Sequence, residues 1–261
     1  NTAVGSLSLD ANTEGSSNTA IGRNSLGSNT TGVTNTAVGH NSLGSNTTAC
    51  CNVAIGYNAL VNNTTGDRLT AVGYCALMSN IDGVNSTAMG WCALRANTTG
   101  VGNTAFGYSS LEDTTTGNEN TSVGYQIMEE NTTGTGNAAF GACALKVNTT
   151  GCFNTAIGTC SLYSNTTACC NVAVGHNALK LNTTGTNNTA LGRFALSATT
   201  GASNTAVGSC ALKVNTTGVN HTAIGKGALI KNTSGAENTA IGMQAMSCNT
   251  TGCQNVAVGI N

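Results

Sequence analysis

Charged side chains are scarce in this chain of 261 residues, and proline is absent. Lys, Arg, Asp and Glu make up 7 % of the residues, whereas glycine numbers 34. A solvated disordered tail carries much more charge, so the composition argues against one. The net charge is −1 and Lys and Arg are scattered, so no basic patch indicates nucleic-acid binding.

Long apolar segments are also missing. No apolar run approaches the roughly 18 residues that span a bilayer, and no signal peptide is present, so we expect no membrane span. The chain lacks an initiating Met and stops partway through a repeat, with ordinary repeats rather than polar caps at its ends. We therefore interpret it as a segment of a longer or processed protein.

One 17-residue pattern fills the sequence. The copy that begins at Asn204, NTAVGSCALKVNTTGVN, is typical, and successive copies start 17 residues apart except for one step of 16 after Asn188. So short a fixed period is typical of a solenoid, in which each repeat forms one rung stacked on the last. Repeat positions are numbered here from 1 to 17. The copies begin at Asn1, Asn18, Asn35, Asn52, Leu69, Ser86, Asn103, Asn120, Asn137, Asn154, Asn171, Asn188, Asn204, His221, Asn238 and Asn255.

The repeat predicts short strands and tight bends. Positions 1 to 5, N-T-A-[VI]-G, suit a strand, and the Gly that always fills position 5 indicates a positive φ or a close backbone approach. Positions 7 to 10, such as 210–213, suit a second strand. The N-T-T-G of positions 12 to 15 predicts a turn in which Asn bonds its own backbone and Gly is left-handed. A helical hairpin is disfavoured, because Thr and paired Gly recur where its interior would lie.

These features predict an all-β fold, a parallel β-solenoid (β-roll) of about 15 rungs that forms a single array over residues 1–261. Every charged residue falls at position 6, 10, 11, 14, 16 or 17. Positions 2 to 5, 8 and 9 carry no charge. We expect them to be shielded from water, because burial of a lone charge is costly, and call them the dry part of the rung.

The dry part has a small face and a bulky face. If positions 7 to 10 form a strand, neighbouring residues point opposite ways, so Ala206 and Ala211 oppose Val207 and Leu212. Only one face can fill the interior, and the other avoids charge over fifteen rungs. We infer that self-association or another surface covers it.

Asparagine fills position 12 in most rungs. Amides that bond up and down the stack are one interpretation. The other is N-glycosylation, because most copies read N-T-T, although sugars on rungs about 4.8 Å apart would be crowded. The candidate acceptors are Asn29, Asn46, Asn63, Asn97, Asn131, Asn148, Asn165, Asn182, Asn215, Asn232 and Asn249.

Position 6 is aromatic in five consecutive rungs, and the strip ends before Ala142. Planar rings at a bend can stack against sugars or bases, or against one another to stiffen the rod. Low basic charge argues against nucleic acid here. The strip consists of Tyr57, Tyr74, Trp91, Tyr108 and Tyr125.

Cysteine recurs at positions 7 and 16, often on adjacent rungs. A spacing of about 4.8 Å lies inside the Cα range that a disulfide accepts. The predicted rung-to-rung pairs are Cys75 with Cys92, Cys143 with Cys160, and Cys152 with Cys169. Buried free thiols that act as small hydrophobic side chains are the alternative.

The remaining cysteine predictions concern turns. Cys248 and Cys253 flank an N-T-T-G turn and are candidates to close it, whereas Cys51 and Cys170, in A-C-C sequences, are candidates for links between chains. Spacing does not establish connectivity. A zinc site is not expected, because no two matching C-x-x-C pairs occur.

Residues suited to catalysis are isolated. His40 and His176 lie at position 6 and His221 at position 1. The acids cluster only at 112–113 and 129–130, which suits a bound cation or, more often, a solvated face. No glycine-rich phosphate loop opens a helix. We expect no enzyme activity, no cofactor and no metal.

The strings NTAIG, NVAIG and NTAVG, each followed by A-L, resemble the S-V-A-I-G repeats of trimeric autotransporter adhesin heads. They are also similar to N-T-A-I-G…N-T-T-G repeats in tail-fibre-like and surface proteins of bacteria and phages. The resemblance covers essentially the whole chain. It implies a left-handed parallel β-roll, assembled as a homotrimer and displayed outside a cell or virion for attachment.

Three features depart from these families. The adhesin rung usually has 14 residues, position 2 is mostly Thr instead of Val, and twelve cysteines suggest an oxidising extracellular setting. We expect a structural segment of an extracellular fibre, surface appendage or adhesin stalk, with or without glycans. The alternatives are an ice-binding solenoid, from its regular Thr rows, and a carbohydrate-binding tail-fibre segment.

Overall fold

The computed structural model describes residues 1–260, and they form an all-β solenoid. Every strand has three residues and comes from repeat positions 2 to 4, and no helix occurs between residues 1 and 260, so none is available to cross a membrane. The strands are β1 (Thr2–Val4), β2 (Thr19–Ile21), β3 (Thr36–Val38), β4 (Val53–Ile55), β5 (Thr70–Val72), β6 (Thr87–Met89), β7 (Thr104–Phe106), β8 (Thr121–Val123), β9 (Ala138–Phe140), β10 (Thr155–Ile157), β11 (Val172–Val174), β12 (Thr189–Leu191), β13 (Thr205–Val207), β14 (Thr222–Ile224), β15 (Thr239–Ile241) and β16 (Val256–Val258).

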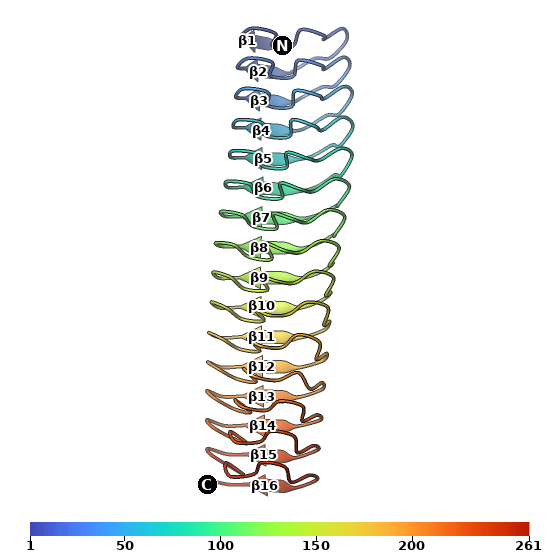
Figure 1. Cartoon of the computed structure of the whole chain (residues 1–261). Coiled ribbons are helices and arrows are strands. Elements are labelled where there is room, and N and C mark those ends of the chain that lie inside the picture. Colours follow the sequence, from blue (N-terminus) through green and yellow to red (C-terminus); the bar gives the residue numbers. More distant parts are fainter. Residues whose placement is uncertain (261) are drawn as a thin grey trace. The chain divides into compact units, whose positions relative to one another are not determined.

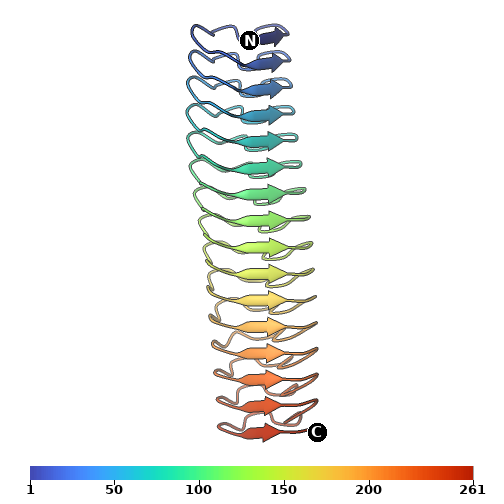
Figure 2. The same ribbon diagram turned by 180° about the vertical axis from the view of Figure 1, so that it is seen from behind.

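The chain divides into two compact units, Asn1–Thr133 with β1 to β8 and Gly134–Asn261 with β9 to β16. The predicted array of rungs is present in each unit. Within a unit each strand pairs with the next one in parallel and in register, as Figure 1 shows, and the strand arrows point the same way in Figure 2.

Register follows the repeat position without a slip. Ala3 pairs with Ala20, and Ala20 pairs with Ala37. The 16-residue rung keeps this order, because Thr189 still pairs with Thr205. The expectation that like residues stack over like is confirmed inside both units.

Glycine at position 5 ends each strand for the predicted reason. Its φ lies between 111° and 143° in all sixteen copies. A Cβ on Gly39 would also collide with the carbonyl oxygen of Gly56 in the next rung. Both the backbone angle and the close approach therefore require glycine.

The predicted second strand at positions 7 to 10 is wrong. This stretch is a turn in which positions 7 and 9 are left-handed, as in Cys210 (φ 61°) and Leu212 (φ 49°). Left-handed backbone costs a non-glycine residue about 1–2 kcal/mol. Full burial of a leucine side chain stabilises by about 1.5–3 kcal/mol, which offsets that cost.

The left-handed turn changes which side chains point inward. Ala206, Ala211 and Leu212 are all fully buried, whereas Val207 is only partly buried. The division into one small face and one bulky face is therefore wrong for positions 8 and 9. Both fill the interior together with Ala at position 3.

Glycine at position 15 also differs from the prediction. It does not have a positive φ; the left-handed residue of this corner is at position 17, for example Thr34 (φ 60°). Gly32 is small because a Cβ there would collide with the Asn29 Oδ1 and the carbonyl oxygen of Ala49. The close packing comes from asparagine, which occupies the other half of the interior.

Asparagines at positions 1 and 12 form two buried ladders of hydrogen bonds. The Nδ2 groups of Asn18 and Asn29 both donate to the carbonyl oxygen of Gly32, at 2.8 and 3.1 Å. Asn18 Oδ1 accepts from the backbone N–H of Asn35 in the next rung, at 2.9 Å. Asn29 Nδ2 also donates to Asn12 Oδ1 at 2.8 Å. The polar interior is thereby satisfied both within each rung and between rungs.

Threonine interrupts the position 12 ladder in two rungs, at Thr114 and at Thr199, and the first interruption leaves a buried acceptor without a partner. Thr114 replaces asparagine there, and the Oδ1 of Asn97 in the preceding rung is buried without a hydrogen-bond partner. We predict that Thr114→Asn restores a donor to this oxygen and stabilises the fold by about 1 kcal/mol. The urea midpoint measures the gain.

Thr116→Asn is the matched control, because position 14 is exposed and faces no orphaned acceptor. It should leave the midpoint unchanged. A Thr114→Asn variant no more stable than this control would contradict the ladder assignment.

His221 replaces asparagine in the position 1 ladder and reproduces its bonds. Its Nδ1 accepts from the backbone N–H of Asn238 at 3.2 Å, and its Nε2 lies 2.6 Å from the carbonyl oxygen of Gly235 as the donor. These contacts need the neutral ring. Burial lowers the pKa of His221, and no charged side chain contributes to the shift.

Acid should therefore destabilise the second unit through this residue. The unfolded imidazole binds a proton near pH 6.5 and the folded one only at lower pH, so stability falls as pH drops through and below that value. We predict that His221→Asn removes part of the loss of stability between pH 7.5 and 5. An equal loss in both proteins, measured by urea unfolding at the two pH values, would contradict this.

Candidate functional site

The outer face of the strands carries an uncharged apolar ladder. Because the buried Ala lies at position 3, positions 2 and 4 point away from the interior. The aliphatic or aromatic residue at position 4 keeps a third or more of its surface exposed in most rungs, for example Ile55 (40 %), Phe106 (36 %), Leu191 (47 %) and Ile224 (39 %). We call the position 4 side chains of each unit its outer ladder. Neither position 2 nor position 4 carries a charge in any rung.

Threonine rows accompany this ladder. Position 2 is mostly Thr and shares the strand face with position 4. The Thr hydroxyls of position 13 are already used, since Thr30 Oγ1 donates to the carbonyl oxygen of Thr47 at 3.1 Å. Position 14 is exposed in every rung that has it, as at Thr48 and Thr99. The fully exposed row of Thr is therefore at position 14, whereas the Thr row of position 2 is half-buried in every rung after the first.

The aromatic residues of position 6 stack on one another in the first unit. Ring centroids of His40 and Tyr57, and of Tyr57 and Tyr74, are 5.3 Å apart, and those of Tyr74 and Trp91 are 4.2 Å apart, with interplanar angles of 8–11°. Tyr108 and Tyr125 stack in the same way at 5.3 Å. Arg23 Nη1 lies 3.0 Å from His40 Nε2 at one end.

This arrangement decides between the two interpretations of the strip. Within each of the two stacks, His40 to Trp91 and Tyr108 with Tyr125, the rings turn their faces toward one another. Stacking of a sugar or a base needs a free face. The geometry is self-stacking, and it does not favour carbohydrate binding along the strip.

The structure is incompatible with N-glycosylation at position 12. Asn46 is fully buried, and its Nδ2 donates to Asn29 Oδ1 at 2.8 Å and to the carbonyl oxygen of Ala49 at 3.1 Å. A glycan on this nitrogen would remove a ladder bond and has no room. The other predicted acceptors are also fully buried, except Asn249, which is partly exposed and donates the same two bonds as Asn46. The geometry therefore favours the amide ladder over glycans at position 12.

The cysteines lie where the repeat places them, and all twelve are free thiols in this structure. At position 16 the sulfur replaces a polar side chain. Cys169 Sγ accepts from the backbone N–H of Cys152 at 3.1 Å, and Cys253 Sγ accepts from that of Ala236 at 3.3 Å. Asp67 Oδ1 does the same for Cys50. These sulfurs act as hydrogen-bond acceptors between neighbouring rungs at the surface of the stack.

Position 7 thiols are buried in the first unit. Cys75 and Cys92 are 6 % and 7 % exposed, and burial raises the pKa of both thiols, so they stay protonated at neutral pH. This supports the alternative of small apolar side chains. Cys51, Cys170, Cys248 and Cys253 are exposed. Disulfides within or between chains stay predictions.

One of the two acidic pairs, at 112–113, is held by an arginine. Arg95 Nε donates to Glu112 Oε1 at 2.8 Å, and Arg95 Nη2 lies 3.5 Å from Asp113 Oδ1. No group of three or more potential metal ligands gathers anywhere in residues 1–260. The ion pairs give these carboxylates a structural role in the rungs.

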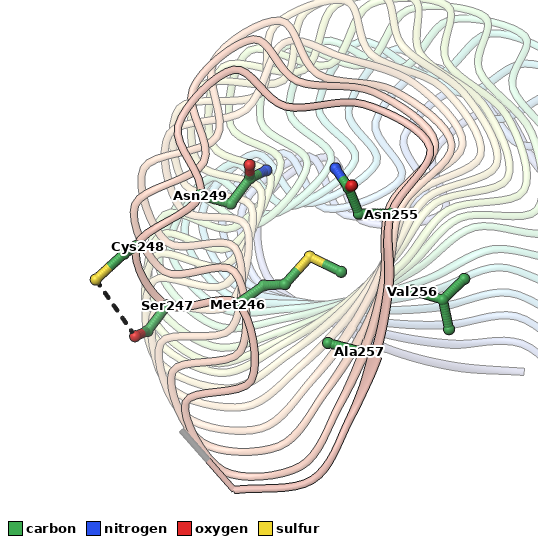
Figure 3. Close-up of a pocket in the computed structure, with 7 residues that line it drawn as sticks. All are labelled: Met246, Ser247, Cys248, Asn249, Asn255, Val256 and Ala257. Carbon is green, nitrogen blue, oxygen red and sulfur yellow. Dashed lines mark hydrogen bonds between the residues drawn. The ribbon is translucent and has the colours of Figure 1, made fainter.

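The one pocket of note lies on the last complete rung, in the second unit. Figure 3 shows Met246, Asn249 and Asn255 pointing into the rung, whereas Val256 and Cys248 point outward. The inward residues occupy positions 9, 12 and 1, which are interior in other rungs. The pocket is the uncovered interior of a rung, not a separate ligand site.

No family model and no curated protein sequence matches this chain. The candidate site therefore rests on geometry alone: the outer ladder at position 4, bordered by the self-stacked aromatic strip.

One feature of the surface was missed in the sequence. The net charge of the whole chain is close to zero because the two units carry net charges of opposite sign. Acidic residues are concentrated before residue 133 and basic residues after it. A charge count for each half would have found it.

Proposed function

We propose that this chain is a structural segment of an extracellular fibre, surface appendage or adhesin stalk, in which copies pack side by side through the outer ladder. The observation that carries the proposal is the exposed apolar row at position 4, which continues without a charge through the rungs of each unit. A soluble monomer rarely exposes a contiguous apolar patch of this extent.

A second copy of the chain suits this surface. The outer ladder repeats once per rung, about every 4.8 Å, and a partner that contacts every rung needs the same period. Another copy has that period. The homotrimer implied by the resemblance is one such assembly.

The interior supports a structural role. Its polar groups at positions 1, 12 and 15 bond one another, so the rung offers rigidity and little free chemistry. The extracellular location rests on the resemblance and on the twelve cysteines.

Charges placed on the outer ladder should abolish this association. We predict that the triple variant Ile55→Glu, Met89→Glu, Phe106→Glu is monomeric at concentrations at which the natural chain forms oligomers. These side chains are 36–40 % exposed, so the isolated fold tolerates the change, whereas a packed interface would bury the charges at high cost. Sedimentation velocity in about 0.5 M salt, which screens other charge effects, measures the difference.

The control carries three glutamates at position 14, Thr48→Glu, Thr99→Glu and Thr116→Glu, where Glu14 and Asp82 occur naturally. It should associate as the natural chain does. A natural chain that is monomeric throughout would refute the proposal. If that monomer also produced thermal hysteresis, its Thr rows would favour ice binding instead.

A further inference from the structure

Charge is segregated between the two units. The first unit, Asn1–Thr133, has nine Asp and Glu against three Lys and Arg, a net charge of −6. The second unit, Gly134–Asn261, has six Lys and Arg against one carboxylate side chain, that of Glu237, a net charge of +5. Fields of opposite sign on two such surfaces speed and strengthen association at low ionic strength.

The bases of the second unit lie at one edge of its rungs. They occupy positions 6, 10 and 11. Phe194 shows that positions 6 and 10 adjoin, because the Arg193 guanidinium carbon is 4.6 Å and Lys213 Nζ is 5.3 Å from its ring centroid, and position 11 directly follows position 10 in the chain. We define the basic edge as Lys180, Arg193, Lys213, Lys226 and Lys231.

Among the described residues of the second unit, the one carboxylate side chain is that of Glu237, and it forms no ion pair with the basic edge. Glu237 lies at position 17, and its Oε2 accepts from Gln254 Nε2 at 3.0 Å. Arg193, Lys226 and Lys231 are exposed. The edge therefore presents uncompensated positive charge over several rungs.

The first unit presents the opposite charge at the same repeat positions. We define the acidic edge as Glu112, Asp113, Glu129 and Glu130, at positions 10 and 11 of two successive rungs. Burial and the neighbouring Glu112 and Glu129 raise the pKa of Asp113, although Arg95 lowers it. Both neighbouring carboxylates thus disfavour the charged form of Asp113, as expected for acids that lie close together.

We infer that the basic edge binds the acidic edge of a second copy of this chain. Both edges use the same positions of the same repeat, so their charges recur with one axial period and can face each other rung by rung. A second copy neutralises both edges, whereas a polyanion such as nucleic acid or a sulfated polysaccharide would neutralise only the basic one. Single exposed ion pairs are weak and screened, so this contact depends on several pairs and on low salt.

This contact is separate from the outer ladder and does not rest on it. Apolar packing of the outer ladder persists at high salt, whereas the contact between the edges is lost there. The experiment can therefore refute either contact without refuting the other. The full chain is compared by sedimentation velocity at about 20 mM and about 500 mM NaCl. We expect a salt-sensitive association in addition to any that persists at the higher concentration.

Charge reversal tests which edges meet. Lys180→Glu with Lys213→Glu lowers the charge of the basic edge from +5 to +1, and Asp113→Lys with Glu130→Lys raises that of the acidic edge from −4 to 0. Each double variant alone should lose the salt-sensitive association, with Kd raised about tenfold or more. An equimolar mixture of the two should associate again. The control, Glu14→Lys with Asp82→Lys, changes the charge of the first unit equally but at position 14, and should behave as the natural chain.

Folding is checked by circular dichroism. If a reversal unfolds the chain, Lys180→Gln with Lys213→Gln replaces it and should weaken association to a lesser degree. The inference is overturned if the natural chain shows no salt-sensitive association, if a folded double variant associates as tightly as the natural chain, or if the mixture stays dissociated. Salt-sensitive binding of heparin without self-association would assign the basic edge to a polyanion instead.

Discussion

Two rows of buried asparagine carboxamides hold the rungs of each unit in register. The Nδ2 groups at positions 1 and 12 converge on the carbonyl oxygen of position 15, as those of Asn18 and Asn29 do on Gly32, and the Oδ1 atoms accept from the neighbouring rung. A buried donor or acceptor left without its partner costs about 1–3 kcal/mol, so a slip by one rung or one residue is heavily penalised. Alanine and leucine fill the remaining space, and small residues at position 15 follow from the approach of the amides.

The period, a short strand within positions 1 to 5 and the glycine of position 5 could be predicted from the sequence, because each recurs in every copy and has one physical explanation. The turn at positions 7 to 10 could not. Leu212 in a left-handed conformation contradicts its local preference, and only the buried interior of the finished rung stabilises it. The two meanings of N-T-T at position 12 were also open until the burial of Asn46 decided for the ladder.

Of the candidate surfaces, too, some features could be predicted from the repeat and others only from the folded rung. An uncharged outer face followed from the exclusion of charge at position 4, and the structure exposes it. The stacking of Tyr57 on Tyr74 was one of two interpretations, and the distance between their rings selected it. Positions 6, 10 and 11 vary freely because they do not contact the interior, and there the two units differ most: aromatic and acidic in the first, basic in the second. Because equivalent rungs stack, residues of one type at the same position of successive rungs form a continuous surface.

Hydrogen exchange of the asparagine side chains tests the account most directly. In an NMR spectrum of the folded chain, the Nδ2 protons of Asn35 and Asn46 should exchange with solvent orders of magnitude more slowly than those of Asn85, whose side chain is exposed. Slow exchange at both repeat positions would establish that the carboxamides are buried and bonded between rungs. Exchange of Asn46 as rapid as that of Asn85 would contradict the ladders, and with them the stacking of the rungs.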